Sequence, residues 1–156
     1  MIDTAAAPAG EAPIVHPDVA EFWAGIAAGA FRLQRCLRCD IVRFPLAPLC
    51  WNCLSPDYVL DDIDGSGTVA VSIVIERVTS GSVWAAQVPY RTGLVNLGAG
   101  PRVPGRILCR CGQAARPGTP VRMCRVAAAE GQADGQAHGQ YMFAFAHECT
   151  GQAPVP

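Results

Sequence analysis

The sequence predicts a small, mainly β protein with a short N-terminal helix, a metal-binding module built around four cysteines, and a five-stranded barrel. Three observations carry this prediction. An apolar stripe with helical spacing lies near the N-terminus, two C-x-x-C pairs follow it, and five short strand-like segments alternate with Gly and Pro turns after residue 65. The chain has 156 residues, of which 51% are hydrophobic and 16% charged, so it can bury a core as one domain of usual size.

Residues 17–30 are expected to form the helix, after a leader of residues 1–16 that is rich in Ala and Pro and predicted to be mobile. Asp18, followed three residues later by Glu21, has the form of a capping box, which would satisfy exposed amides at the helix start. Gly29 suits a left-handed helix end. A helix of about ten residues is not stable alone and must dock on another surface.

The apolar stripe of this helix has two interpretations. Its members recur at positions i, i+3, i+4 and i+7 and are Val19, Phe22, Trp23 and Ile26. Such stripes usually pack against the same domain, which is the favoured interpretation. In the alternative, Phe22 and Trp23 form part of a partner-binding surface.

Four cysteines predict a zinc site. Cys36, Cys39, Cys50 and Cys53 form the pattern C-x2-C-x10-C-x2-C. A two-residue spacing lets a tight turn aim both sulfurs at one point, and two such turns complete a tetrahedron around zinc. The ten-residue spacer is just long enough for a return strand. Four thiolates leave no open coordination position, so the zinc is expected to be structural, and an independent zinc enzyme is disfavoured.

Five segments predict the strands of a small closed or partly open barrel, because each is rich in β-branched or apolar residues and is bounded by turn signals. They are residues 67–78, 90–97, 102–110, 120–126 and 141–147. The low-complexity segment 131–140 before the last strand is expected to be a mobile loop. Asp61 and Asp62, beside a glycine turn, are interpreted as part of a solvated loop.

Charge and composition exclude several function classes. There is no lysine, which removes Schiff-base chemistry and a Walker-type phosphate loop. Eight arginines stand against one acid between Glu76 and Arg125, so this half could attract nucleic acid, a nucleotide-bearing cofactor or an acidic partner, unless the arginines simply cover solvent-facing strands. The chain carries no membrane-spanning run and no secretion signal, which predicts a cytoplasmic protein with reduced thiols.

The remaining cysteines have no pattern that assigns them a role. Cys109, Cys111, Cys124 and Cys149 lack the paired spacing of the first four, and a small buried apolar side chain is the favoured interpretation for each. A pair of Cys111 or Cys149 with His147 stays open, although nothing in the spacing supports it.

The order of short motifs resembles the zinc-ribbon/OB-fold family, long catalogued as a domain of unknown function. The matching segments run in the family's order over about residues 17–147. They are Phe31 to Cys36, Phe44-Pro45, Gly65 to Thr68, Pro89-Tyr90 with Leu94 to Leu97, Gly100 to Arg102, and Pro117 to Arg122. In one departure, Asp40 stands where the family usually has glycine, and Asp tolerates the left-handed backbone of such a turn. Two further departures from the family's pattern occur at Asn96 with Ala99 and at residues 109–112. They make it harder to infer contacts with a partner protein from other members of the family.

The resemblance implies a rubredoxin-like zinc ribbon followed by a five-stranded OB-fold barrel, with the ribbon over residues 31–60, the barrel over 61–149 and a tail from 150 to 156. It also implies a non-catalytic accessory subunit of a thiolase-like enzyme (a thiolase, acyltransferase or aldolase) that acts on acyl-CoA, stabilising the partner and helping to form its acyl-CoA site in a hetero-oligomer. On this basis Arg91, Arg102 and Arg106 are candidate contacts for the coenzyme A phosphates.

The alternative is a nucleic-acid-binding module, since zinc ribbons and OB barrels both serve that function. The sequence disfavours it, because single-strand binders stack bases on aromatic side chains. Between residues 58 and 125 the aromatic residues are Tyr58, Trp84 and Tyr90.

Overall fold

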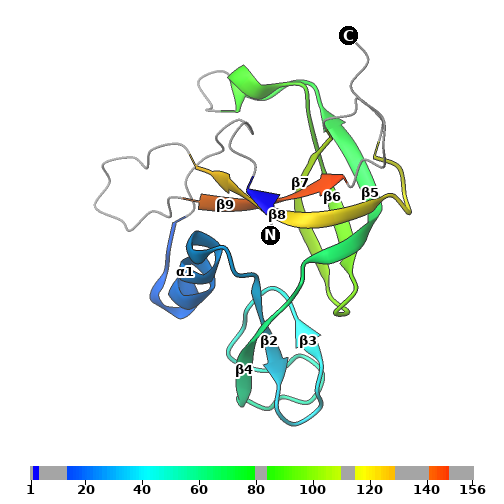
Figure 1. The fold of residues 1–156 in the computed structure, drawn as a ribbon. Helices are drawn as coiled ribbons and strands as arrows, with labels where there is room; N and C mark the ends of the chain where they lie inside the picture. The colour runs from blue at the N-terminus through cyan, green and yellow to red at the C-terminus, as the bar shows by residue number, and fades with distance from the viewer. Residues whose placement is uncertain (1, 4–13, 80–83, 110–114, 129–140, 148–156) are drawn as a thin grey trace.

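A computed structural model describes residues 2–3, 14–79, 84–109, 115–128 and 141–147, and confirms a mainly β protein with one short N-terminal helix (Figure 1). The expected mobile loop at 131–140 and the tail at 150–156 lie outside these residues. Residues 2–3 of the expected mobile leader form a short strand, β1 (Ile2–Asp3), parallel to β8 (Pro120–Ala127). Among the described residues, no helix is long and apolar enough to cross a membrane.

The helix begins differently from the prediction. A 3-10 turn, η1 (Pro17–Val19), leads into α1 (Ala20–Ala28), and neither element has a side-chain hydrogen bond at its cap, so the expected capping box of Asp18 and Glu21 does not form. Pro17 fixes the backbone of the first turn instead, because its ring sets φ near the helical value. The helix end is as predicted, since Gly29 has φ 82° in the left-handed region.

The ribbon module is a three-stranded antiparallel sheet in the order β3-β2-β4. Its strands are β2 (Arg32–Cys36), β3 (Val42–Arg43) and β4 (Tyr58–Asp62). The return strand expected between the cysteine pairs is therefore β3. The expected solvated loop at Asp61 and Asp62 is wrong: both residues lie in β4, where cross-strand pairing places arginines of β2 near them.

Ion pairs connect these two ribbon strands. Asp61 accepts a hydrogen bond from Arg35 Nε at 2.7 Å, and Asp62 one from Arg32 Nε at 2.9 Å. Exposed pairs of this kind contribute little to stability, about 0–1 kcal/mol. They accompany the backbone pairing of β4 with β2, which makes a strand of a segment whose acidic sequence resembles a loop.

The second module is a closed five-stranded barrel. Its strands are β5 (Ser66–Ile75), β6 (Tyr90–Leu97), β7 (Arg102–Leu108), β8 and β9 (Tyr141–His147). They run in the order β8-β5-β6-β7-β9, and β9 pairs again with β8 to close the barrel; β7 and β9 are parallel and the other pairs antiparallel. A second 3-10 turn, η2 (Ala85–Gln87), precedes β6. The five predicted strands are therefore all present, with small shifts at their ends.

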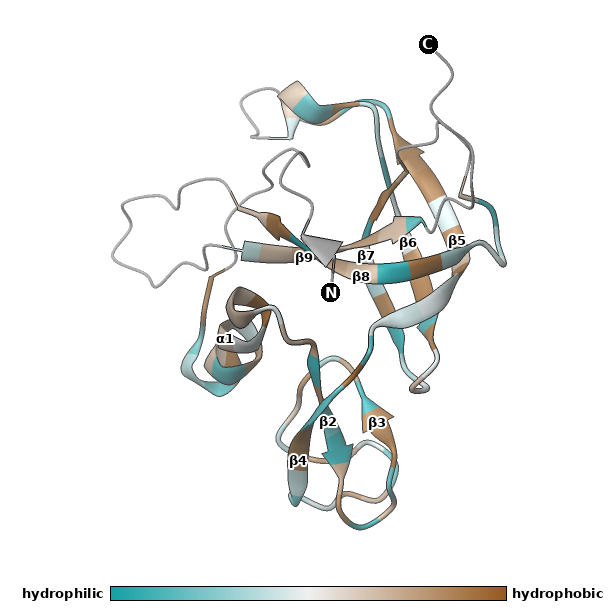
Figure 2. Cartoon of the chain, in the orientation of Figure 1, coloured by the Kyte–Doolittle hydropathy of each residue, from teal (hydrophilic) through white to brown (hydrophobic). Residues whose placement is uncertain are grey.

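The sharp bend of β5 requires a glycine on its neighbour. Pairing between β5 and β6 shifts register between Val69 and Val71, and Gly93 of β6 lies against this bulge. A Cβ atom at residue 93 would stand 2.1 Å from the Val71 carbonyl oxygen, so no other residue fits. Beyond the bulge β5 is hydrophobic along its length (Figure 2), with Val71, Ile73 and Val74 exposed.

Aromatic side chains join the helix, the ribbon and the barrel. Phe143 of β9 contacts Phe22 of α1, Phe31 at the ribbon entrance and Phe44 beyond β3, with ring centroids 6.0, 5.7 and 6.4 Å apart. Arg125 of β8 adds a hydrogen bond from Nη1 to the Ala27 carbonyl oxygen at 2.6 Å, which satisfies one acceptor at the helix end. The three parts therefore share one hydrophobic core.

Candidate metal centre and the adjoining groove

The first cysteine turn begins where β2 ends. The Cys36 amide donates to the Ile41 carbonyl oxygen at 3.0 Å, and the Asp40 amide donates to the Cys36 carbonyl oxygen at 2.9 Å. Closing so tight a turn requires a left-handed residue after the second cysteine, and Asp40 has φ 60°. The aspartate thus adopts the backbone conformation expected of it in the sequence analysis.

The second cysteine turn has the same two backbone hydrogen bonds as the first, at the same spacing in the sequence. The Cys50 amide donates to the Ser55 carbonyl oxygen at 2.9 Å, and the Leu54 amide to the Cys50 carbonyl oxygen at 2.8 Å. Leu54 has φ 58°, although leucine has no side-chain hydrogen bond to offset the steric cost of this conformation. The same backbone geometry at both turns directs two pairs of sulfurs to one point.

The four sulfurs have the spacing of a metal-binding tetrahedron. Cys36 Sγ lies 3.6 Å from Cys53 Sγ, Cys39 Sγ lies 3.7 Å from Cys50 Sγ, and all four lie within 4.8 Å of one another. Four thiolates about 2.3 Å from a zinc ion would stand about 3.8 Å apart. The separations exceed the roughly 2.05 Å of a disulfide bond, and the four thiols are free. The predicted quartet is thus brought together and fits a tetrahedral metal ion.

Local hydrogen bonds favour the thiolate form of Cys39. The Ile41 amide, helped by the Asn52 side chain, lowers the pKa of Cys39 to about 6. At Cys53 the Ser55 amide also lowers the pKa, but burial and the other three thiols outweigh it and raise the pKa to about 12. A lowered pKa at one thiol and a raised pKa at another are what four crowded thiols show before a cation neutralises their charge. A divalent ion would saturate the quartet and leave no position for a substrate.

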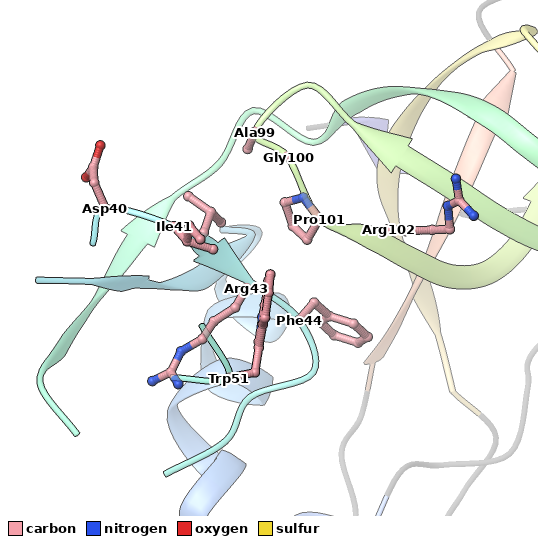
Figure 3. Close-up of a pocket in the computed structure, with 10 residues that line it drawn as sticks. Asp40, Ile41, Arg43, Phe44, Trp51, Ala99, Gly100, Pro101 and Arg102 are labelled. Carbon is pink, nitrogen blue, oxygen red and sulfur yellow. The ribbon is translucent and has the colours of Figure 1, made fainter. Parts of the chain in front are cut away.

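A groove of about 580 Å³ separates the ribbon from the turn between β6 and β7 (Figure 3). It is lined on the ribbon side by residues 40–44 and Trp51, and on the barrel side by residues 99–102. Trp51 is 69% exposed although it neighbours a buried cysteine. The groove is thus formed by the two modules together.

Arg43 is the unusual residue of this groove. Its side chain is 1% exposed, and its three guanidinium nitrogens are buried without a hydrogen-bond partner. The contact that holds it is the ring of Tyr58, 5.4 Å from the guanidinium carbon. Sequence reasoning did not select Arg43. Alternation along a strand places its side chain on the face opposite to Val42 and Phe44, so the local pattern gave no signal that it is buried.

The three arginines predicted to contact phosphates do not lie together. Arg102 lines the groove at the ribbon end of β7, and its Nε donates to Asn96 Oδ1 at 2.8 Å. Arg91 and Arg106 lie at the other end of the β6–β7 pair. Arg91 Nη1 donates to Ser72 Oγ at 3.2 Å.

Arg106 is engaged by aromatic rings. Its guanidinium carbon lies 5.3 Å from the Trp84 ring centre and 4.9 Å from that of Tyr90, and desolvation lowers its pKa. Its Nη1 donates to Gln87 Oε1. Arg102 is therefore the candidate that faces an open space.

The two aromatic residues of the helix differ in exposure. Phe22 is 3% exposed and belongs to the core, so its side chain presents no surface to a partner in this structure. Trp23 is half-buried and packs at the edge of the same core, with its ring centroid 6.3 Å from that of Phe143. Part of Trp23 thus stays accessible, and its partner contact remains a prediction.

Comparison with known proteins finds similarity for the barrel domain and for the fold. No curated protein matches the chain in sequence. Residues 61–126 match the family model described as the C-terminal OB-fold domain of ChsH2. The model covers most of the barrel.

Two solved structures share the fold. One, titled as an Ltp2-ChsH2(DUF35) aldolase, contains a chain with 23% identity and a TM-score of 0.71, over 88% of this chain and 99% of that one. The other is a DUF35-family protein of unknown function from Sulfolobus solfataricus, with 15% identity and a TM-score of 0.51, over 70% of this chain and 78% of that one. At these identities the likeness concerns the fold. Taken with the domain match, it shows that residues 61–126 are similar to the C-terminal OB-fold domain of ChsH2 and that the chain shares the fold of DUF35 proteins.

Proposed function

We propose that the protein is a non-catalytic accessory subunit that binds a thiolase-like enzyme acting on acyl-CoA thioesters. The observation that carries this proposal is the similarity, over 88% of the chain, to a chain of the Ltp2-ChsH2(DUF35) aldolase. The domain match over residues 61–126 supports it. The accessory subunit would stabilise the enzyme and help to shape its acyl-CoA site.

In this proposal the four cysteines hold a structural zinc ion. The sulfur separations suit zinc, and a quartet of thiolates is a ligand set that zinc prefers. The ion would cross-link two loops in a module too small to fold by hydrophobic burial alone, and its binding would contribute about 10 kcal/mol or more to folding. Reduced thiols are needed, which suits the cytoplasm.

Within the proposed complex, Arg102 is the best placed contact for a coenzyme A phosphate. It is exposed and lines the groove between ribbon and barrel, where a guanidinium can meet a phosphate oxygen in a bidentate manner. Arg91 and Arg106 remain candidates with weaker support, because both are half-buried and lie at the other end of the β6–β7 pair, away from the groove.

The nucleic-acid alternative has less support. The three aromatic residues available between residues 58 and 125 each contact an arginine of the same chain: Tyr58 contacts Arg43, while Trp84 and Tyr90 contact Arg106. Stacking of bases would have to displace these contacts, whereas single-strand binders present free aromatic faces.

Purification of the tagged protein from its native cell tests the proposal. We expect a thiolase-like enzyme in stoichiometric amount, whose acyl-CoA turnover falls when the small subunit is removed and returns when it is added back. Arg102→Met should raise the KM for acyl-CoA of the complex several-fold, while Arg116→Met, an exposed arginine away from the groove, should not. Acyl-CoA turnover by the isolated small subunit at enzyme-like rates would refute the proposal.

A further inference from the structure

Large apolar side chains are exposed around the cysteine quartet of the described ribbon. We call them the tip patch, and each lies next to one of the cysteines in the sequence: Leu37, Leu49, Trp51 and Leu54. They are between 51% and 71% exposed. The first cysteine turn lies where β2 ends, at the end of the ribbon that points away from the helix (Figure 1). Because the four sulfurs lie within 4.8 Å of one another, these side chains are gathered around one centre and are not scattered singly.

Leu54 is the member of the patch that the fold itself does not explain. Asp40 and Leu54 hold the same place in the two cysteine turns and have nearly the same backbone, with φ 60° and 58°. An aspartate tolerates this left-handed conformation, whereas a leucine adopts it at a steric cost. The Leu54 side chain is 71% exposed, so burial within the described chain does not offset that cost. A strained and exposed apolar residue indicates a contact made outside the fold.

A cation without an acidic partner lies beside the tip patch. Arg38 Nη1 donates to the carbonyl oxygen of Cys53, which precedes Leu54, at 3.4 Å. Arg32 and Arg35 of the same ribbon have aspartate partners, but among the described residues no carboxylate pairs with Arg38. A charge that an interface covers needs a partner of opposite sign. A protein that covers the patch would therefore bring a carboxylate to this guanidinium.

A membrane surface does not suit the tip patch. Asp40 and Asp57 lie beside the same two turns, and their charges offset those of Arg35 and Arg38. Surfaces that bind anionic lipids combine apolar residues with a net positive charge. The balanced charges around this patch favour a protein surface instead.

We propose that the tip patch is a docking surface for the thiolase-like enzyme, and that it takes an apolar surface of that enzyme with a carboxylate opposite Arg38. The inference rests on the proposed function for the identity of the partner. Trp51 supports the assignment, because it belongs to the patch and also lines the groove that contains Arg102. An enzyme docked on the patch would thus also border the groove proposed for acyl-CoA.

The test measures affinity and stability on the same variants. The enzyme that co-purifies with the small subunit is separated from it, and metal-loaded small subunit is then titrated into the enzyme by calorimetry. Leu54→Gly should weaken binding about tenfold or more, yet leave the isolated subunit at least as stable, because the change removes apolar contact area and also relieves strain. Leu37→Ala should weaken binding by a similar factor. Ile73→Ala, at an equally exposed position of the barrel, should change affinity by less than about twofold.

Substitutions of Arg38 test the carboxylate on the partner. Arg38→Gln should weaken binding several-fold and make the affinity less sensitive to salt, because it removes one side of a charge pair. Arg38→Glu should weaken binding more than Arg38→Gln, since it sets two negative charges against each other. An affinity of Arg38→Glu equal to that of the unmodified chain would refute the carboxylate.

Three other outcomes would overturn the inference. Full affinity in both Leu54→Gly and Leu37→Ala, or an equal loss in Ile73→Ala, would refute the docking surface and leave the proposed function intact. Light scattering that shows a dimer of the isolated subunit, converted to a monomer by Leu54→Gly, would assign the patch to a second copy of the chain. If no thiolase-like enzyme co-purifies with the unmodified chain, the proposed function fails and this inference fails with it.

Discussion

Phe22 of the helix and Phe143 of the last barrel strand meet edge to face, with ring centroids 6.0 Å apart and ring planes at 89°. Phe143 also contacts rings from the ribbon entrance and from the end of β3. A single side chain of β9 thus holds the two N-terminal parts against the barrel. Edge-to-face aromatic pairs add about 0.5–1.5 kcal/mol each beyond the area they bury.

Replacement of Phe143 should therefore weaken the packing of the helix, the ribbon and the barrel against one another. We expect Phe143→Ala to lower the free energy of unfolding by about 3 kcal/mol, because a shared core residue leaves a cavity between modules. Val74→Ala, at an exposed position of β5, should change it by less than about 0.5 kcal/mol. Urea unfolding followed by tryptophan fluorescence measures both, and equal effects would contradict the role assigned to Phe143.

The left-handed leucine of the second cysteine turn predicts a stabilising substitution. Leu54→Gly should raise the free energy of unfolding of the metal-loaded protein by about 0.5–1 kcal/mol, since glycine adopts φ 58° without steric cost. Leu37 is exposed in the first turn but lacks a positive φ, so Leu37→Gly should lower stability by a similar amount. Thermal unfolding of the two variants measures both changes in stability. Changes of the same sign would argue against strain at Leu54.

The buried guanidinium of Arg43 predicts a second stabilising substitution. Arg43→Met should raise the free energy of unfolding by about 1 kcal/mol or more, because it removes an unpaired buried charge at similar volume, despite loss of the contact with Tyr58. Arg116→Met provides the exposed control, with an expected change below about 0.5 kcal/mol. A lower stability for Arg43→Met would show that the guanidinium has a favourable partner in solution.

At the bulge of β5 the backbone of β6 approaches so closely that residue 93 must be glycine. Gly93→Ala should destabilise the barrel by about 3 kcal/mol, because the new methyl group would overlap the Val71 carbonyl oxygen. Gly98→Ala is the matched control, since its nearest neighbour, Ser66 O, would be 3.7 Å away. Amide hydrogen exchange should show loss of protection in β5 and β6 for the first variant, and an unchanged pattern in Gly93→Ala would refute the predicted overlap.

The lowered pKa of Cys39 predicts a pH dependence of the metal-free protein. Its folded pKa of about 6 lies below the ordinary value of 9.0, so its contribution to stability is complete above pH 9 and disappears as the pH falls to 6. Thiolate absorbance near 240 nm should show one extra thiolate between pH 6 and 8 in the unmodified chain compared with Cys39→Ser. Identical titrations in this range would contradict the assignment. Protons also compete with the metal, so metal affinity should fall on acidification.

The sequence predicted the parts of this structure that depend on local pattern. The strands at 90–97 and 141–147 have the predicted ends, because apolar content and turn residues bound them clearly. The quartet of cysteines followed from spacing, since a C-x-x-C turn fixes both sulfurs locally. The left-handed backbone of Asp40 followed from its residue type.

The predictions that failed concern residues whose contacts lie with partners distant in the sequence. Asp61 and Asp62 are strand residues because β4 pairs along its length with β2, a strand distant in the sequence, and no local pattern reveals this. Arg43 is buried and contacts the ring of Tyr58 in β4, 15 residues further along the chain, on a ribbon face that an isolated strand would expose. The contact of Cys109 Sγ with His147 Nδ1, 3.6 Å apart, required the register of two parallel strands with 32 residues between them in the sequence.

The pairing of Arg32 with Asp62 brings the two ends of the ribbon together. Cross-strand neighbours lie only about 5 Å apart, so the polypeptide returns to its place of departure after thirty residues. Loops between these two positions could change in length without moving the helix or the barrel, provided that Leu33, Val42 and Phe44 keep their places in the shared core. The module can thus be exchanged during evolution, or by an engineer, as one cassette whose two ends and core-facing side chains are fixed.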